Sequence, residues 1–324
     1  MAVRATVVGS YPKPPDEGQA FKVRKTLHGI EKGKASAEDL KAAQDELVTQ
    51  VIEEQEAAGI DLVTDGLGRW DDILTPFARN WAGFEIGPLF RWFDNNVYYR
   101  RPVCNGAVEW RGPSSVDAFR FAASVAVKPV KAVIPGPVSF ARLSLDEHYG
   151  DHDAFVLAVA GVLAQEAAEL EAAGATVIQI DEPSLLGAPE DLTLAREAVG
   201  IITAALSHTT TILATYFGDA KRLGADLFDI PVDGFGFDLV SGPENLELIK
   251  AVPRGRIVQA GLLDARNTKL EAEDELLDRI GQILDSVPAQ DLWISPSCGL
   301  EFLPREKARA KLQRLGDVAK KAGA

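Results

Sequence analysis

The chain has 324 residues, of which 46% are hydrophobic and 25% charged, the balance of a globular protein. Its formal net charge is −14, and no cluster of basic residues offsets the excess of acidic ones. Neither a nucleic acid nor an anionic membrane is therefore expected as a partner. The sequence also lacks an uninterrupted apolar run of about 18 residues, the minimum for a membrane-spanning helix.

In chain order, eight strand-like runs alternate with stretches of helical character. The strands are expected to begin near residues 3, 60, 130, 175, 209, 232, 256 and 292. The helices are expected at 36–58, 115–127, 151–174, 192–207, 243–251, 271–286 and 304–321, with a short one at 218–224. This alternation predicts one α/β domain over residues 1–324, a (β/α)8 TIM barrel. A doubly wound sheet is the alternative, but the first loop reads GSYPKP rather than G-x-G-x-x-G.

Residues 68–112 interrupt the alternation after the second expected strand. They contain four of the five tryptophans, Trp70, Trp81, Trp92 and Trp110, together with the stretch WFDNNVYYRRPV. We expect an aromatic-rich insertion with a hairpin that caps a pocket. Aromatic residues at this density more often form a satellite core than a binding surface.

The N-terminus and the cysteines bear on the cellular compartment. MAVRATVVGSYPKP becomes polar too soon for a secretory signal and is expected to form the first strand. Two cysteines, Cys104 and Cys298, are too few for a disulfide scaffold. The expected compartment is therefore the cytoplasm.

The stretch ATVIQIDEPS, residues 175–184, predicts a buried strand that ends in two carboxylates. Its β-branched, apolar run suits a strand covered on both faces, and Pro183 cannot continue it. Asp181 and Glu182 therefore fall at the strand's carboxyl end, where TIM barrels bind their substrates. The alternative is that either carboxylate only caps the next element or pairs with a buried arginine.

Polar residues also follow the other expected strands. Those at the shared mouth of the barrel would be Ser10, Tyr11, Asp65, Asp181, Glu182, Tyr216, Asp238, Asp264, Asn267 and Cys298. A mouth so rich in carboxylates favours a substrate with a positive charge or many hydrogen-bond donors, or a metal ion.

Cys298 has two interpretations. Its thiolate is suited to bind a soft metal or to attack an electrophile, but an unpaired cysteine is more often a small buried hydrophobe. No second cysteine or histidine stands at metal-ligand spacing to it. His148 and His152 are four residues apart, but Gly150 lies between them, which weakens a shared helical face.

Several motifs together resemble the catalytic barrel of the cobalamin-independent methionine synthase family over nearly the full chain. They are VVGSYPKP, EEQEAAGIDLVTDG, WFDNNVYYRRPV, VIPGPVSF, VIQIDEPSL, GLLDARN and WISPSCGLEFLP. The resemblance implies a zinc ion bound by a His-x-Cys pair, a glutamate and a late cysteine. It also implies that zinc keeps the thiol of homocysteine ionised for attack on a methyl donor such as methyltetrahydrofolate.

Carried over residue by residue, the resemblance is partial. Gly9 and Ser10 match the turn that holds the amino acid's carboxylate, and Asp181 matches an aspartate that holds its ammonium group. The second ammonium ligand, a glutamate, is replaced by Leu67.

The zinc ligands match less well. Cys298 fits the late cysteine, and Asp238 falls near the place of the zinc glutamate. The His-x-Cys position reads Thr215-Tyr216-Phe217, which offers zinc no ligand of either type.

Three hypotheses follow. The first is an S-methyltransferase acting on a thiol such as homocysteine with a separate methyl donor, and with zinc held by Cys298 and Asp238. The second is a metal-free enzyme on another substrate, and the third is a non-catalytic binding barrel or partner subunit. The expected catalytic residues are Asp181, Glu182, Tyr216 and Cys298, and the expected substrate-binding residues are Gly9, Ser10, Tyr11, Asp65, Asp238 and Asn267.

Overall fold

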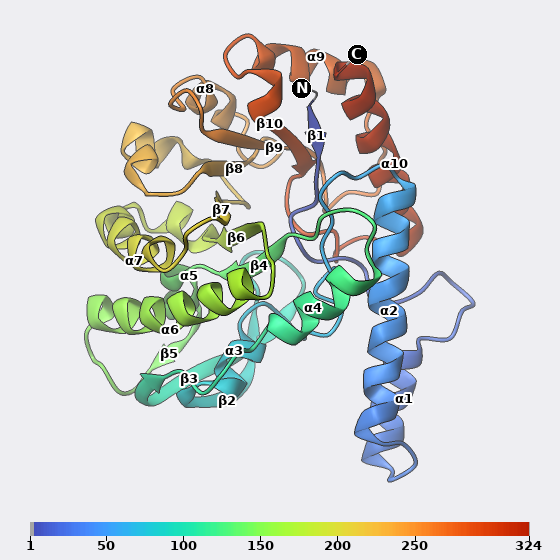
Figure 1. The fold of residues 1–324 in the computed structure, drawn as a ribbon, viewed down its shortest axis with the longest axis vertical. Helices are drawn as coiled ribbons and strands as arrows, with labels where there is room; N and C mark the ends of the chain where they lie inside the picture. Colours follow the sequence, from blue (N-terminus) through green and yellow to red (C-terminus); the bar gives the residue numbers. More distant parts are fainter. Residues whose placement is uncertain (1–2, 324) are drawn as a thin grey trace.

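The computed structural model describes residues 3–323, and its centre is a curled parallel sheet surrounded by helices (Figure 1). Seven strands pair side by side in the order β1-β10-β9-β8-β7-β6-β4. Their bounds are β1 Arg4–Ala5, β4 Ala132–Pro135, β6 Val177–Asp181, β7 Thr210–Ala214, β8 Gly234–Asp238, β9 Ile257–Leu263 and β10 Leu292–Pro296.

The eighth expected strand, at residues 60–64, is present only as two isolated parallel bridges. Thr6 pairs with Leu62 and Val63 pairs with Val130, which connects β1 to the start of β4 and closes the ring. The expectation of eight full strands is therefore wrong in this segment, for a local reason. Gln55 of the preceding helix bonds both backbone groups of Thr64, donating to its carbonyl at 2.9 Å and accepting from its N–H at 3.0 Å. These groups are thus unavailable to a neighbouring strand.

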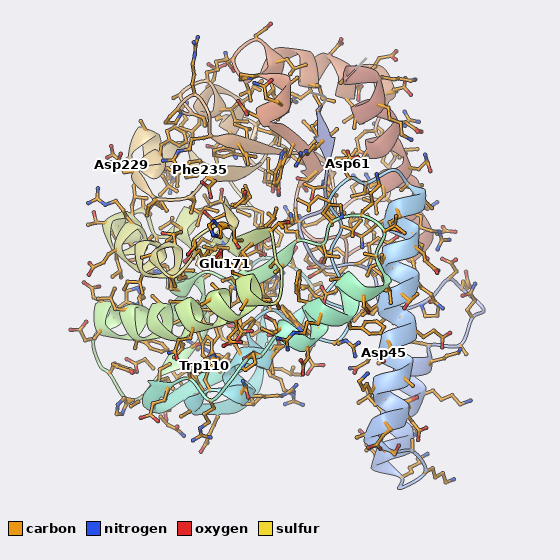
Figure 2. The ribbon with its side chains drawn as sticks, viewed as in Figure 1. Asp45, Asp61, Trp110, Glu171, Asp229 and Phe235 are labelled. Carbon is orange, nitrogen blue, oxygen red and sulfur yellow. The ribbon has the colours of Figure 1, made fainter. Side chains whose placement is uncertain are left out.

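Side chains also tie the first strand to this segment. Asp61, labelled in Figure 2, accepts a hydrogen bond from the Ala5 backbone N–H at 3.0 Å, and its own N–H donates to the Ala5 carbonyl at 2.9 Å. Both backbone groups of Ala5, the last residue of β1, are thereby satisfied.

Most of the helices cover the outside of the sheet, whereas the first packs on the second and the third packs against the hairpin of residues 82–109. They are α1 Lys22–Glu31, α2 Ala37–Ala57, α3 Thr75–Asn80, α4 Val116–Val125, α5 Pro137–Leu143, α6 His152–Ala172, α7 Leu192–Ala204, α8 Asn245–Ile249, α9 Glu273–Leu284 and α10 Arg305–Ala322. Four 3₁₀ segments lie at Pro183–Gly187, Pro189–Asp191, Ala220–Asp229 and Ala289–Asp291. Ser36 caps α2 in a reciprocal capping box with Asp39, as its position before the helix predicts. Helices α1, α3 and α5 were not expected from the sequence, and the expected 218–224 helix is the longer 3₁₀ segment at Ala220–Asp229.

The aromatic segment contains the expected hairpin. Strands β2 (Ala82–Arg91) and β3 (Tyr98–Glu109) pair antiparallel, and β5 (Leu145–Asp146) adds to β3 in parallel. Trp81 packs its ring against Phe77 and Phe140, with centroids 5.5 and 5.0 Å apart, so part of the segment forms a core with α5.

Alternation along β6 sets the layers inside the barrel. Val177, Gln179 and Asp181 share one face, while Ile178 and Ile180 share the other, and all five residues are buried. Val177 belongs to an apolar cluster with Leu62, Ile212 and Trp293. Polar residues therefore occupy the inner face of β6 only toward its carboxyl end.

The described residues contain no helix that is both long and apolar enough to cross a membrane.

Candidate active site

A cavity of about 210 Å³ opens at the carboxyl ends of the barrel strands. The barrel contributes Ser10 and Tyr11 after β1, Asp181 at the end of β6, Tyr216 after β7, and Gly299 and Glu301 after β10. The aromatic segment contributes Trp70, Ile73, Trp92, Val97, Tyr98 and Tyr99. Four of the residues expected at the mouth thus line one cavity, and the aromatic segment forms part of its wall.

Asp181 is held in a fixed orientation at the base of this cavity. Its Oδ1 accepts a hydrogen bond from Gln179 Nε2 at 2.6 Å, and its Oδ2 accepts one from the Tyr216 hydroxyl at 3.0 Å. Burial raises the pKa of Asp181 to about 7, although both hydrogen bonds and the charge of Lys131 favour its ionised form. Burial, together with the charge of Asp181, also raises the pKa of Tyr216 well above its ordinary value, so the phenol remains a donor.

Lys131 lies beneath Asp181, inside the barrel. Its ammonium donates to Gln179 Oε1 at 2.5 Å, to the Val7 carbonyl at 2.6 Å and to Gln259 Oε1 at 3.3 Å. Burial lowers the pKa of Lys131 to about 7, opposed by the charge of Asp181. The sequence did not predict Lys131 at the site. Its only indication there was that a lysine stands within an apolar strand.

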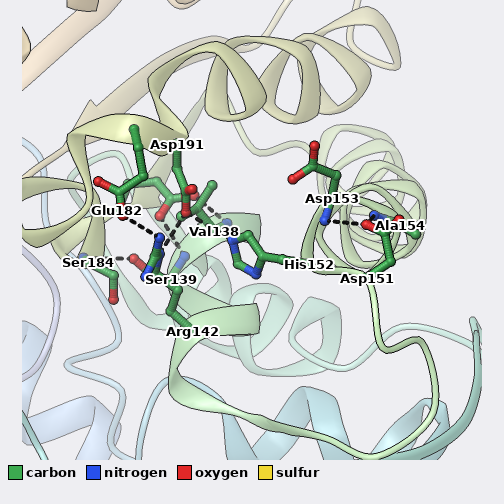
Figure 3. A network of polar contacts seen from close by, with 11 residues as sticks. Val138, Ser139, Arg142, Asp151, His152, Asp153, Ala154, Glu182, Ser184 and Asp191 are labelled. Atoms are coloured by element: carbon green, nitrogen blue, oxygen red, sulfur yellow. Dashed lines mark hydrogen bonds and ion pairs between the residues drawn. The ribbon is translucent and has the colours of Figure 1, made fainter.

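The Glu182 side chain points away from the cavity that Asp181 lines. It accepts hydrogen bonds from the backbone N–H groups of Val138 and Ser139, both at 2.8 Å, at the start of α5 (Figure 3). A Cβ atom on Gly136 would lie 2.1 Å from the Glu182 carboxyl carbon, so a glycine is needed for this close approach. Glu182 does not line the cavity, and its carboxylate caps α5 as an anion at a helix N-terminus. The sequence offered capping of the next element as an alternative; Glu182 instead caps α5, which precedes β6 in the chain.

The loop after β1, which carries Gly9, Ser10 and Tyr11, contacts other loops at the barrel mouth. The Ser10 carbonyl accepts a hydrogen bond from the Leu300 N–H at 2.8 Å, which joins the first and last loops. The Tyr11 hydroxyl donates to Glu54 at 2.8 Å, and burial raises its pKa beyond its usual range. Gly9 supplies its carbonyl to the Thr64 hydroxyl at 2.8 Å and is buried without lining the cavity.

Asp65 lies beside this cavity rather than in it. Its Oδ1 accepts the backbone N–H of Leu67 at 2.9 Å and holds that residue at a φ of 50°. Burial raises the pKa of Asp65, while the charges of Arg69 and Lys13 act in the opposite direction. Leu67 itself lines the cavity, so an apolar side chain occupies this part of the wall.

Glu301 and Lys13 line the cavity but were not expected from the sequence. The Lys13 ammonium donates to the Trp70 carbonyl, and burial lowers the pKa of the lysine. Glu301 is partly buried as a residue, while its Oε2 atom is buried without a hydrogen-bond partner among residues 3–323. Burial raises the pKa of Glu301 to about 7; Lys13 lowers it and Asp181 raises it. Sequence reasoning missed Glu301 because it follows the end of β10 by five residues.

Among residues 3–323, the two expected zinc ligands do not form a metal cage with other side chains. Cys298 is 1% exposed, and burial together with the charges of Glu301 and Asp238 raises its pKa well above the ordinary value. The carboxylate of Asp238 already accepts three backbone N–H groups, those of Phe217, Val240 and Ser241, at 3.1, 2.9 and 2.8 Å. Within residues 3–323, no three His, Cys, Asp or Glu side chains gather in a group suited to a metal ion. The donor set therefore does not fit zinc.

One expected substrate-binding residue, Asn267, falls outside the cavity, and His152 pairs with a carboxylate elsewhere. Asn267 is exposed, and its side chain accepts the Lys269 N–H at 3.0 Å in a surface turn. His152, one of the spaced histidines, contacts Asp191 at 2.9 Å (Figure 3). Neither residue lines the cavity.

Comparison with known proteins gives consistent results. Residues 3–321 match the family model described as cobalamin-independent synthase, catalytic domain. A methionine synthase of Saccharolobus solfataricus is 34% identical over 95% of this chain and 91% of its own length. A methionine synthase of Sulfurisphaera tokodaii is 33% identical, with 95% and 88% covered.

Two solved structures share the fold. A B12-independent methionine synthase from Shewanella sp. W3-18-1, in complex with selenomethionine, superposes with a TM-score of 0.86 at 22% identity, covering 99% of this chain and 98% of that chain. A putative vitamin-B12 independent methionine synthase from Listeria monocytogenes gives a TM-score of 0.77 at 20% identity, with 99% and 98% covered.

Proposed function

The chain belongs to the cobalamin-independent methionine synthase family, and from this membership we propose that it is an S-methyltransferase that methylates a thiol such as homocysteine. In the reaction, a bond forms between the acceptor's sulfur and the methyl carbon while the bond from that carbon to the donor breaks. The thiol proton passes to the donor atom that released the methyl group, or to water. Both substrates of this reaction are small molecules.

The observation that carries the proposal is the fixed position of Asp181 in the cavity. Its two hydrogen bonds, from Gln179 and Tyr216, orient a buried carboxylate toward a bound ligand without further reorganisation. We propose that this carboxylate binds the ammonium group of the acceptor and that the Ser10 turn binds its carboxylate. Asp181 would then be the main anchor for an amino acid, and Tyr216 would keep that anchor in place.

The aromatic wall supplies the environment that methyl transfer needs. Trp70, Trp92 and Tyr99 are each less than 10% exposed and line the cavity. A bound sulfur nucleophile shielded from water in this way loses less of its reactivity to solvation. We propose that residues 68–112 are an insertion whose role is to close the cavity over the two substrates.

Zinc would ionise the acceptor thiol in a member of this family that binds it. Within residues 3–323, Cys298 and Asp238 are not joined by further metal ligands, so the proposed reaction includes no step that depends on zinc.

The test is conversion of L-homocysteine to methionine by the purified chain, followed by mass spectrometry. Methyltetrahydrofolate, its triglutamate form and methylcobalamin are the donors to try. We expect turnover with at least one donor and a loss of at least about 100-fold in Asp181→Asn, the size expected for a lost charged contact. Asp117→Asn is the matched control, since the Asp117 side chain is 98% exposed. Wild-type protein that forms no methionine with any donor would contradict the proposal.

A second candidate is a metal-free enzyme for another substrate, favoured by Thr215, Tyr216 and Phe217 at the expected zinc-ligand position. A third candidate is a partner subunit that completes a site with another protein. It is favoured by the same three residues at the zinc-ligand position. Co-purification with a stoichiometric protein that restores turnover would favour the third.

The two cysteines are both free and buried, which is consistent with the cytoplasm as the proposed compartment.

A further inference from the structure

The buried oxygen of Glu301 is an unexplained feature of the cavity. Oε2 has no hydrogen-bond partner among residues 3–323, although the side chain lines the cavity wall. A buried carboxylate oxygen without a partner is costly, and such groups in native proteins usually have a ligand or a role. Lys13, the lysine in the same wall, directs its ammonium to the Trp70 carbonyl instead.

Gly299 explains how Glu301 reaches this position. A Cβ atom at residue 299 would lie 2.1 Å from Glu301 Oε2 and 3.0 Å from Ser10 Cβ. Any side chain at 299 would therefore force the carboxylate away from the loop that carries Ser10. The hydrogen bond from the Leu300 N–H to the Ser10 carbonyl, 2.8 Å long, fixes the two loops against each other. The Glu301 carboxylate is thus held beside Ser10 in the cavity wall.

The charges of the wall indicate what the carboxylate binds. One lysine faces four acidic residues in the lining, which are Asp71, Asp72, Asp181 and Glu301. Asp181 already accepts hydrogen bonds on both oxygens, whereas Glu301 has a buried oxygen, Oε2, that has no partner among residues 3–323. A ligand that brings a positive charge and N–H donors would satisfy that oxygen and relieve its burial cost. A divalent metal ion would need more oxygen ligands than this part of the described chain gathers.

We propose that Glu301 is a specificity-determining residue that, together with Asp181, receives the primary ammonium group of the methyl acceptor. This inference rests on the proposed function for the identity of the acceptor. Glu301 supplies a negative charge to the cavity lining from the loop after β10, whereas Leu67, which also lines the cavity, supplies none. The acceptor's carboxylate at Ser10 and its ammonium at Glu301 would lie next to each other, as they do in an α-amino acid.

The experiment compares two acceptors that differ only in the amino group, L-homocysteine and 4-mercaptobutanoate, by isothermal titration calorimetry. Wild-type protein is expected to bind homocysteine more tightly. Glu301→Gln is expected to weaken homocysteine binding about 10- to 100-fold, the size of one lost charge-assisted hydrogen bond, and to leave 4-mercaptobutanoate within about 2-fold.

Asp117→Asn is the matched control. The Asp117 side chain is 98% exposed, pairs with Arg120 at 3.5 Å and does not line the cavity. Removing this charge should change the affinity for both ligands by less than about 2-fold, because exposed ion pairs contribute little. Thermal unfolding of each variant verifies that it is folded, and Glu301→Asp serves as a second variant that keeps the charge but shortens its reach.

Three results would overturn the inference. They are equal binding of homocysteine by wild type and Glu301→Gln, an equal loss for both ligands in that variant, or no preference of wild type for homocysteine. The proposed function is tested separately, by turnover. Homocysteine binding that depends on Glu301, without any methyl transfer, would support the inference and contradict the proposed function. Methyl transfer that is unaffected by Glu301→Gln would support the proposed function and contradict the inference.

Discussion

The Lys131 ammonium lies 2.5 Å from Gln179 Oε1 in the interior of the barrel. The same glutamine donates from Nε2 to Asp181 at 2.6 Å, so one amide connects a buried cation to the carboxylate at the cavity floor. An amide that accepts at one end and donates at the other can serve both charges at once. We therefore regard Lys131 as a positioning residue that acts on Asp181 through Gln179.

The first prediction concerns Lys131→Met. Loss of the buried positive charge should raise the pKa of Asp181, because the Lys131 charge lowers it in the wild type. Binding of homocysteine requires ionised Asp181 in our account, so the pH at which binding reaches half its maximum should move up by about one unit. Calorimetric titrations between about pH 5.5 and 8.5 measure this shift. Lys128→Met, at a lysine whose side chain is 44% exposed, is the control and should show no shift; an identical curve for both variants would refute the role of Lys131.

The second prediction concerns Glu182→Gln. The amide can accept only one of the two N–H groups of Val138 and Ser139, and its own N–H₂ group would face the other. We expect a loss of about 1–3 kcal/mol in the free energy of unfolding at pH 8, where Glu182 is ionised. The turnover of the folded fraction should stay within about 2-fold of wild type, since the carboxylate does not line the cavity. A large fall in turnover with unchanged stability would instead favour a catalytic role.

The third prediction is a dependence of stability on pH. The folded-state pKa of Glu301 is raised to about 7 from an ordinary value of 4.5, so the folded protein binds a proton that the unfolded chain releases. The protonated Glu301 carboxyl therefore contributes stability that is fully present below the pKa of Glu301 in the unfolded chain. This stability is lost as the pH rises toward 7. Glu301→Gln removes it. The gain in stability of this variant over wild type should be on the order of 2 kcal/mol larger at pH 7 than at pH 5. Urea unfolding at both pH values measures the difference, and a gain that does not grow with pH would contradict the burial of an unpaired carboxyl group.

The fourth prediction concerns metal. Since Asp238 is engaged by three backbone N–H groups and Cys298 lacks other ligands within the described residues, the purified protein should contain much less than about one zinc per chain. Cys298→Ala should leave that content unchanged by elemental analysis. About one zinc per chain that disappears in the variant would mean that ligands rearrange around Cys298 and that the family's thiolate chemistry is retained.

Particular residues show how far the sequence predicted this site. Ser10, Tyr11, Asp181 and Tyr216 were found because each directly follows an apolar strand, and parallel strands direct their carboxyl ends to one mouth. The sequence places Asp181 and Glu182 together at the end of one strand, yet alternation at the strand end sends neighbouring side chains to opposite faces. That rule was available from the sequence and would have separated them.

Other residues could not be predicted in the same way. Glu301 reaches the cavity only because the chain folds back at Gly299 against the Ser10 loop, and such a contact between distant loops leaves no local pattern. The eighth strand was predicted from its apolar run, but Gln55, a helix residue, takes the hydrogen bonds that would have extended it. Both cases depend on tertiary contacts that the spacing of residues does not encode.

The most direct test of the whole account is a crystal structure of the protein with L-methionine, the product of the proposed reaction. We predict that its ammonium group lies within hydrogen-bond distance of Asp181 and Glu301, its carboxylate at the Ser10 turn, and its methylthio group under the aromatic wall formed by Trp70, Trp92 and Tyr99. Methionine bound elsewhere, or with its ammonium group away from both carboxylates, would contradict the assignment of this cavity as the site of methyl transfer.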